Sequence, residues 1–255
     1  MIKQNLENII GKLPSGVQLV AVSKFHPVER LMEAYDAGQR VFGENRPQEL
    51  AAKVPQMPSD VQWHFIGHLQ TNKLKLVLPY VTLVQSVDSL HLLEAISSWA
   101  VANNRVVDVL LELHLGAEET KQGFSEEEIV AIVSGVGVSS QTAASRPLPS
   151  ARASHELGPL PLMSPRVAQV WEDTPTPLAN VRIRGLMGMA THTEDEAVIE
   201  QDFARIEALF HRIKALGIEG FDTLSIGMSG DWPLAVRHGA TIVRIGTDIF
   251  GPREY

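Results

Sequence analysis

The chain has 255 residues, 44% of them hydrophobic, no cysteine and a formal net charge of −8. This length fits one large α/β domain or two small ones. The acidic balance argues against a nucleic-acid partner, and the lack of cysteine excludes disulfides, thiolate chemistry and Cys-ligated zinc. The first residues mix charged and amide side chains among apolar ones, and no later stretch is long enough for a membrane span. We therefore expect a cytoplasmic protein that does not bind a membrane.

The first apolar run, VQLVAV at 17–22, is typical of a parallel strand that is covered on both faces. Lys24 follows it, just before the sequence His26-Pro27. Ligands of α/β proteins bind at the carboxyl ends of such strands, so Lys24 is a candidate amine nucleophile. On this stretch alone, a solvated loop lysine remains the more ordinary interpretation.

Strands and helices alternate along the rest of the chain. A helix is predicted from Val28, with apolar residues at helical spacing and Gly38 after its end. Further strands are predicted at 40–45, 61–67, 81–87, 106–116, 181–190, 223–228 and 241–251, with helical segments between them. Eight strand–helix units after one extra helix favour a single-domain (β/α)8 TIM-type barrel over residues 1–255.

One segment departs from this alternation. Residues from 135 to about 180 are rich in Pro, Ser, Ala and Gly, with few apolar residues at any period. Such a composition buries too little apolar surface to offset the entropy of ordering, so we expect a mobile insertion with one short helical turn near 165–171. An inert insertion is favoured over a binding lid.

The last two strands are each followed by glycine and a hydroxyl residue, in SIGMSGDW at 225–232 and RIGTDIFG at 244–251. Glycine lets the backbone approach an anion, and the hydroxyls of Ser229 and Thr247 can donate to phosphate oxygens. The loops after strands seven and eight of a barrel are a recurrent phosphate site. Simple barrel turns are the competing interpretation.

A closed barrel brings the eighth strand next to the first, so Lys24 shares its rim with this phosphate site. An amine near a phosphate site suits pyridoxal 5′-phosphate, and it equally suits an aldolase that forms a Schiff base with a sugar phosphate. Arg244, inside the last strand, favours pyridoxal 5′-phosphate over the aldolase. A guanidinium that faces the pyridine nitrogen keeps that nitrogen unprotonated and makes the cofactor a poor electron sink. The alternative is an arginine that reaches outward to the helices.

The ordered motifs AVSKFHP, FGENRPQEL, WHFIGHLQTNK, SVDS, GAEETKQGF, RGLMGMA, SIGMSGDW and VRIGTDIFG resemble the pyridoxal phosphate homeostasis protein family, also called the YggS or proline synthetase co-transcribed family. The resemblance covers nearly the whole chain except the insertion. It implies a monomeric fold-type III barrel like the barrel domain of alanine racemase. The implied function is to hold pyridoxal 5′-phosphate and to buffer it, or deliver it to apoenzymes by transient contact, without strong catalytic activity.

The resemblance also implies roles for single residues. Lys24 becomes the Schiff-base lysine and Arg244 the partner of the pyridine nitrogen, while the phosphate ligands are Ser229, Gly246 and Thr247. Further pocket residues are Asn45 and, through its backbone, Met228. The chain departs from many members of the family at Phe25-His26, where a Thr or Lys pair is common, so the rim of the pocket differs.

Two other interpretations compete with this one. A zinc pair formed by His64 and His68 is disfavoured, because this stretch is predicted as a strand that runs into a glycine turn and offers no third ligand. The rival function is a fold-type III enzyme such as an amino-acid racemase or decarboxylase. Racemisation needs a second base opposite the lysine, and the chain has only three tyrosines, Tyr35, Tyr80 and Tyr255, and no second domain to supply one.

Overall fold

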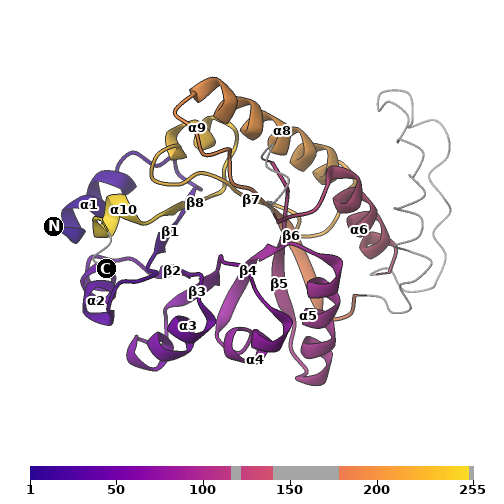
Figure 1. Cartoon of the computed structure of the whole chain (residues 1–255), viewed down its shortest axis with the longest axis horizontal. Coiled ribbons are helices and arrows are strands. Elements are labelled where there is room, and N and C mark those ends of the chain that lie inside the picture. The colour runs from indigo at the N-terminus through magenta and orange to yellow at the C-terminus, as the bar shows by residue number, and fades with distance from the viewer. Residues whose placement is uncertain (116–121, 140–177, 253–255) are drawn as a thin grey trace.

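The computed structural model describes residues 1–115, 122–139 and 178–252. In this part of the chain, eight parallel strands close into a barrel in sequence order, with helices around the outside (Figure 1). The strands are β1 Gln18–Val22, β2 Val41–Glu44, β3 Gln62–Phe65, β4 Val81–Val87, β5 Val107–Glu112, β6 Val181–Met187, β7 Thr223–Ser225 and β8 Ile242–Ile245. The (β/α)8 barrel and its eight strands are confirmed.

The helices follow the predicted alternation. They are α1 Ile2–Ile10, α2 Val28–Asp36, α3 Pro47–Lys53, α4 Leu74–Val77, α5 Leu90–Ala102, α6 Glu126–Ser139, α8 Glu196–Lys214, α9 Trp232–Arg237 and α10 Thr247–Phe250, with 3₁₀ turns at Val54–Gln56 and Thr71–Lys73. Gly38 follows α2 with a φ of 101°, the left-handed conformation that glycine adopts after a helix end. No helix among the described residues is long and apolar enough to cross a membrane.

The predicted insertion lies mostly outside the described residues, as does the helical turn expected near 165–171. Its expected start at 135 was wrong, because α6 continues to Ser139. Gly135 and Gly137 weaken a helix but do not end it, and the apolar pattern alone gave no sign of the continuation. After the gap, the described chain resumes at 178, just before β6.

Side chains of the strands face either the inside of the barrel or the helices around it. Those that fill the inside form a cluster of their own: Val20, Val41, Leu83, Leu110, Met187 and Ile242. Alternate residues of a strand face the same side, so the residue two positions further on also points inward, closer to the carboxyl-terminal rim. By this alternation Gln85, Glu112 and Arg244 lie inside the barrel, above an apolar layer.

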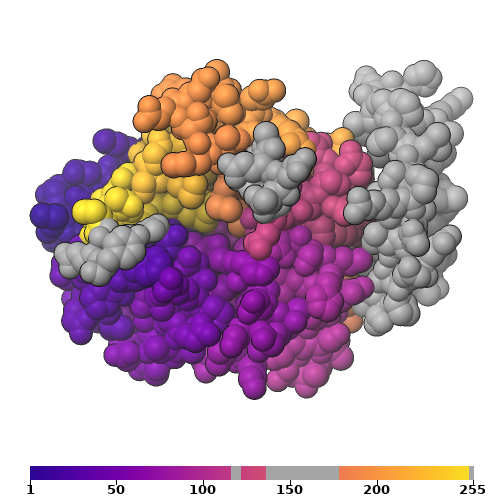
Figure 2. Space-filling model, viewed as in Figure 1, coloured from indigo at the N-terminus to yellow at the C-terminus, as the bar shows by residue number. Residues whose placement is uncertain are grey.

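The barrel closes where the two ends of the chain meet. β1 pairs in parallel with β8 over four residue pairs, from Gln18 with Ile242 to Ala21 with Ile245. The side chain of Asn5 in α1 donates to the carbonyl of Ile249 in α10 at 3.0 Å. Figure 2 shows the indigo residues of the N-terminal elements beside the yellow residues of the last ones. Residues far apart in sequence therefore share this side of the rim.

Candidate functional site

Four neighbouring strands, in the order β7, β8, β1, β2, carry the predicted site residues to one rim. Val20 of β1 pairs with Arg244 of β8, and Val22 of β1 pairs with Gly43 of β2. On the other side, the amide of Arg244 donates to the carbonyl of Gly227, just after β7. The loops that follow these strands therefore lie side by side at the carboxyl-terminal end of the barrel.

Lys24 lies two residues beyond β1 and is half-buried. The next residue, Phe25, has a φ of 66°, in the left-handed region that non-glycine residues seldom adopt. The guanidinium of Arg46 stacks over the Phe25 ring at 4.3 Å from its centroid. The structure thus places Lys24 at the rim on a sharply turned loop.

Arg244 points into the barrel and not outward to the helices. Its side chain is buried, with 4% of the residue exposed. One terminal nitrogen, Nη1, donates to the backbone oxygen of Ser225 at 2.8 Å and to the Ser225 hydroxyl at 2.6 Å, and Nη2 donates to the carbonyl of Gly188 at 2.9 Å. Burial lowers the pKa of Arg244 to about 10, so the guanidinium remains charged at neutral pH.

A chain of buried hydrogen bonds extends from Arg244 across the barrel. The Ser225 hydroxyl accepts from Arg244 and donates to Oε1 of Gln85 at 2.7 Å, while Nε2 of Gln85 lies 2.8 Å from Nδ1 of His64. Burial lowers the pKa of His64 to about 4, so its ring is neutral and Nδ1 can accept from the Gln85 amide. Sequence reasoning missed this network, although Gln85 and Ser225 stand out as polar residues within apolar strands.

The two histidines considered as a metal pair have different partners. His64 is part of the buried network, whereas Nδ1 of His68 lies 2.8 Å from a carboxylate oxygen of Asp88 on the next strand end. Among the described residues, no group of three or more His, Cys, Asp or Glu side chains is arranged to hold a metal ion.

Glu112 is a second ionisable group inside the barrel, at the carboxyl end of β5. Only 7% of the residue is exposed. Burial raises the pKa of its carboxyl to about 7; Asp88 adds to this increase, and the charges of Arg244 and His68 oppose it. A carboxyl and a guanidinium therefore influence each other across the upper layer of the barrel interior.

The turn after β7 brings Ser229 to the rim. Gly227 has a φ of 92°, and a Cβ there would lie 2.6 Å from Cβ of Ala235, so α9 packs against this turn only because glycine occupies it. The amide of Met228 donates to Oδ1 of Asp231 at 2.6 Å. The Met228 amide is therefore already engaged within the turn, while the half-buried Ser229 follows it.

Gly246, Thr247 and Asn45 complete the rim. Gly246 precedes α10, and a Cβ there would lie 3.2 Å from the carbonyl oxygen of Val22, so β8 passes close to the end of β1. Thr247 is exposed. Oδ1 of Asn45 is buried and has no hydrogen-bond partner among the described residues. The sequence-predicted site residues, Lys24 to Thr247, are thus gathered on adjoining loops or directly beneath them.

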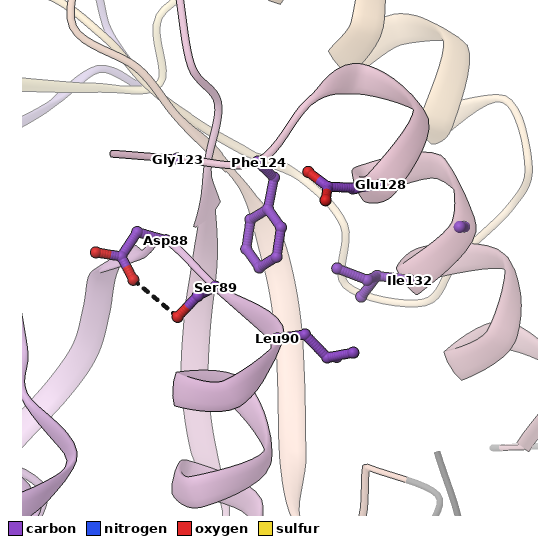
Figure 3. A pocket seen from close by; sticks show the side chains of 8 residues that line it. Asp88, Ser89, Leu90, Gly123, Phe124, Glu128 and Ile132 are labelled. Carbon is purple, nitrogen blue, oxygen red and sulfur yellow. Dashed lines mark hydrogen bonds between the residues drawn. The ribbon is translucent and has the colours of Figure 1, made fainter. Parts of the chain in front are cut away.

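A cavity of about 160 Å³ lies on the opposite side, between the starts of α5 and α6. Figure 3 shows Asp88 and Ser89 at one side and Phe124, Glu128 and Ile132 at the other. It is bordered by the strand ends of β4 and β5 rather than by the loops after β7, β8, β1 and β2. None of the predicted site residues lines it.

Comparison with known proteins identifies the family. The sequence model described as "Alanine racemase, N-terminal domain" matches residues 1–141. The chain is 31% identical to the pyridoxal phosphate homeostasis protein of Vibrio alginolyticus, over 100% of this chain and 98% of that protein, and 32% identical to that of Pasteurella multocida, over 100% and 95%. The chain belongs to the pyridoxal phosphate homeostasis protein family.

Solved structures agree with this assignment to the pyridoxal phosphate homeostasis protein family. PipY of Synechococcus elongatus, in a structure described as having PLP bound, is 32% identical, with a TM-score of 0.75 over 98% of this chain and 100% of that one. An alanine racemase from Clostridium difficile is only 12% identical, with a TM-score of 0.68 over 97% of this chain and 56% of that one. The racemase shows a shared fold and no more.

Proposed function

We propose that this protein binds pyridoxal 5′-phosphate covalently and reversibly through Lys24, and buffers it or delivers it to apoenzymes. The observation that carries the proposal is the placement of Lys24 just beyond β1, beside the inward-facing Arg244 of the neighbouring strand β8, at a rim that also holds Ser229 and Thr247. The relatives named for pyridoxal phosphate homeostasis, and the PLP-bound structure of PipY, support the choice of cofactor.

The residues present fit this group. Oδ1 of Asn45 is a buried acceptor with no partner among the described residues, so a donor on a ligand would satisfy it. Gly67 packs against Asn45 so closely that a Cβ there would lie 2.4 Å from the Asn45 carbonyl oxygen, which holds Asn45 at the rim. A guanidinium carries five N–H donors, and Arg244 commits three of them to the bonds described above, leaving donors for a ring nitrogen.

Each residue then has a distinct task. The Lys24 amine adds to the aldehyde carbon and one water is released; addition of water reverses the reaction and frees the cofactor. The hydroxyls of Ser229 and Thr247 donate to the phosphate, and Gly246 lets the backbone pass close to it. When bound, the cofactor supplies a reactive aldehyde and an electron-accepting ring. Arg244 remains charged beside that ring and so disfavours a second positive charge on its nitrogen.

We further propose that the protein is not an efficient catalyst. Tyr35 donates to Asp60 at 2.7 Å, just before β3, and Tyr80 is 43% exposed just before β4. Both therefore lie at the amino-terminal end of the barrel, away from Lys24, and Tyr255 lies outside the described residues. Within the described part of the chain, no tyrosine is placed to act as the second base that racemisation needs.

The test is chemical trapping. The purified protein, loaded with pyridoxal 5′-phosphate, is reduced with borohydride, and its peptides are analysed by mass spectrometry. We expect the cofactor mass on Lys24, and no trapped cofactor in Lys24→Ala. The control Lys75→Ala changes an exposed helix lysine and should leave trapping unchanged. Equal trapping in Lys24→Ala and the parent would refute the assignment.

Two further measurements separate a carrier from an enzyme. Incubating the loaded protein with a panel of amino acids should give no turnover, and mixing it with a cofactor-free transaminase should restore that enzyme's activity. Fast racemisation or decarboxylation would favour an amino-acid racemase or decarboxylase instead.

We also propose that the protein acts as a monomer in the cytoplasm. Sedimentation tests the first part of this proposal, and cell fractionation tests the second.

A further inference from the structure

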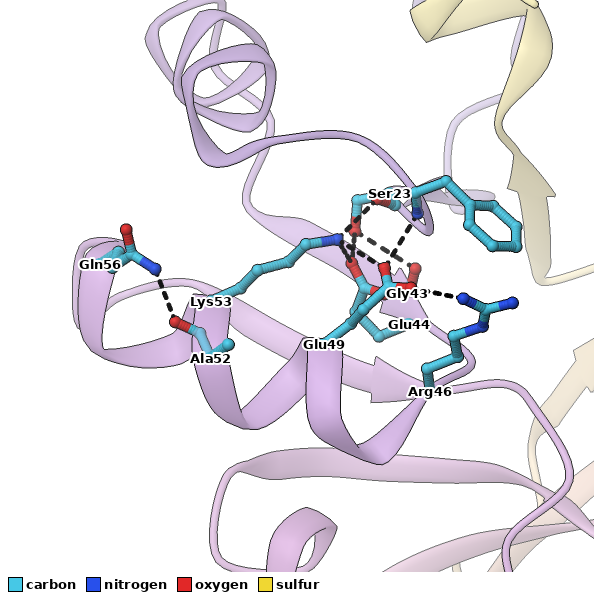
Figure 4. Close-up of polar contacts among 9 residues, drawn as sticks. Ser23, Gly43, Glu44, Arg46, Glu49, Ala52, Lys53 and Gln56 are labelled. Carbon is cyan, nitrogen blue, oxygen red and sulfur yellow. Dashed lines mark hydrogen bonds and ion pairs between the residues drawn. The ribbon is translucent and has the colours of Figure 1, made fainter. Parts of the chain in front are cut away.

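A group of charged side chains outside the barrel holds the loop that carries Lys24. We call it the α3 clamp: Glu49 and Lys53 on α3, with Glu44 at the end of β2 (Figure 4). Nζ of Lys53 lies 2.7 Å from Oε1 of Glu44 and 3.1 Å from Oε2 of Glu49. None of these residues is needed for the proposed contacts with the cofactor.

The α3 clamp binds the backbone on both sides of Lys24. Nζ of Lys53 donates to the carbonyl oxygen of Ser23 at 2.9 Å, and the amide of Phe25 donates to Oε2 of Glu49 at 2.9 Å. Figure 4 shows these bonds converging on the loop. One helix therefore fixes the peptide group before Lys24 and the peptide group after it.

The backbone conformation of Phe25 requires contacts that hold it in place. Phe25 has a φ of 66°, a region in which a non-glycine residue is less stable than in its ordinary conformations. A hydrogen bond from the Phe25 amide helps to hold this conformation, and with it the direction of the chain at Lys24. Glu49 supplies the acceptor.

The burial of the α3 clamp indicates a role in orientation more than in stability. Glu44 is fully buried, 7% of Lys53 is exposed, and Oε2 of Glu44 has no partner among the described residues. Burial raises the pKa of Glu44, against the opposing effect of Lys53. Apolar residues in place of a buried ion pair are often as stable or more so, so what the ions contribute here is directional bonding to the backbone.

We propose that Glu49 and Lys53 are positioning residues for Lys24. By fixing both peptide groups around it, they hold the Lys24 amine in line with the aldehyde of the bound cofactor. The inference rests on the proposed function. Covalent bond formation is sensitive to such alignment, whereas binding of the phosphate and the ring by the loops after β7 and β8 is not.

The experiment compares two ligands in each protein. Pyridoxal 5′-phosphate can react with Lys24, whereas 4′-deoxypyridoxine 5′-phosphate has the same ring and phosphate but no aldehyde. The ratio of their affinities reports the contribution of Lys24, and the rate of bond formation is followed by stopped-flow absorbance. In Glu49→Ala we expect the ratio and the rate to fall about tenfold or more, with the affinity for the deoxy analogue unchanged.

Conservative and control variants complete the design. Glu49→Gln keeps an oxygen that accepts from the Phe25 amide, so it should restore most of the ratio. Gln56→Ala removes an exposed side chain near α3 that bonds only within its own turn, to Ala52, and should change nothing. Lys53→Met is combined with Glu44→Gln so that no charge is buried unpaired; if this double variant does not fold, the Glu49 variants still decide.

Three outcomes distinguish the possibilities. A lowered ratio in Glu49→Ala that Glu49→Gln restores supports the proposal. An unchanged ratio and rate, or an equal loss of affinity for both ligands, would overturn it, because a general structural defect affects both ligands alike. Equal affinity for the two ligands in the parent protein would instead refute the proposed function of Lys24, whatever the variants show.

Discussion

Glu112 makes the stability of the barrel depend on pH. Its carboxyl is buried and lies near the negative charge of Asp88, so its pKa rises from 4.5 to about 7. Because the folded-state pKa is the higher one, ionisation penalises the folded state and not the unfolded chain. The free energy of unfolding should therefore fall as the pH rises from about 4.5 to about 7, and the loss remains above that range.

The size of this effect follows from the pKa difference. The step from 4.5 to about 7 corresponds to about 3 kcal/mol, and Glu112→Gln removes it, since the amide has nearly the same shape and no charge. We expect Glu112→Gln and the parent to have similar stability near pH 4.5, and the variant to be more stable by about 3 kcal/mol near pH 8. The attraction of Arg244, which lowers the pKa of Glu112, is already contained in this figure.

The assay is urea unfolding of the cofactor-free protein at a series of pH values, read by far-UV circular dichroism. Omitting the cofactor keeps its binding energy out of the comparison. Glu128→Gln is unsuitable as a control, because Glu128 caps α6; Glu33→Gln, on the exposed side of α2, is a better one. A difference between Glu112→Gln and the parent that does not vary with pH would show that the carboxyl is not the source.

Two further predictions concern the rim and the buried network. The double variant of Ser229→Ala and Thr247→Val should weaken pyridoxal 5′-phosphate binding, measured by equilibrium dialysis, by roughly 1.5–3 kcal/mol for each lost hydrogen bond to the phosphate. Borohydride should still trap the cofactor on Lys24. An unchanged affinity would show that the phosphate binds elsewhere. Ser225→Ala should lower the free energy of unfolding by about 1–3 kcal/mol, because Gln85 loses its donor inside the barrel; no change in urea unfolding would contradict this.

Much of the fold could be predicted because the strands are largely buried and read as mostly apolar runs, as in 17–22. The rim of the candidate site followed from the same pattern, since Lys24, Ser229 and Thr247 each come just after such a run. The start of α6 is a capping box, which the spacing of Ser125 and Glu128 indicates: the amide of Ser125 donates to Glu128, and the Ser125 hydroxyl accepts from the Glu128 amide.

The contacts that orient these residues could not be predicted, because they join positions far apart in the chain. Ser225 and Gln85 are separated by 140 residues, and Lys53 reaches a carbonyl 30 residues earlier. Local sequence gives no measure of which inward polar side chains will meet across a barrel. Glu49 and Lys53 resembled an ordinary exposed pair on a helix, and only the packing of α3 against β1 and β2 gives them a different role.

The pairing of β1 with β8 has a consequence for how the protein is made. Lys24, just beyond β1, is translated well before Arg244, which lies on the strand that pairs with β1. At about 5–20 residues per second, tens of seconds separate the two. On a nascent chain, Lys24 is therefore present before β8, the neighbouring strand that carries Arg244, has been made, so the proposed site is complete only once β8 has been translated.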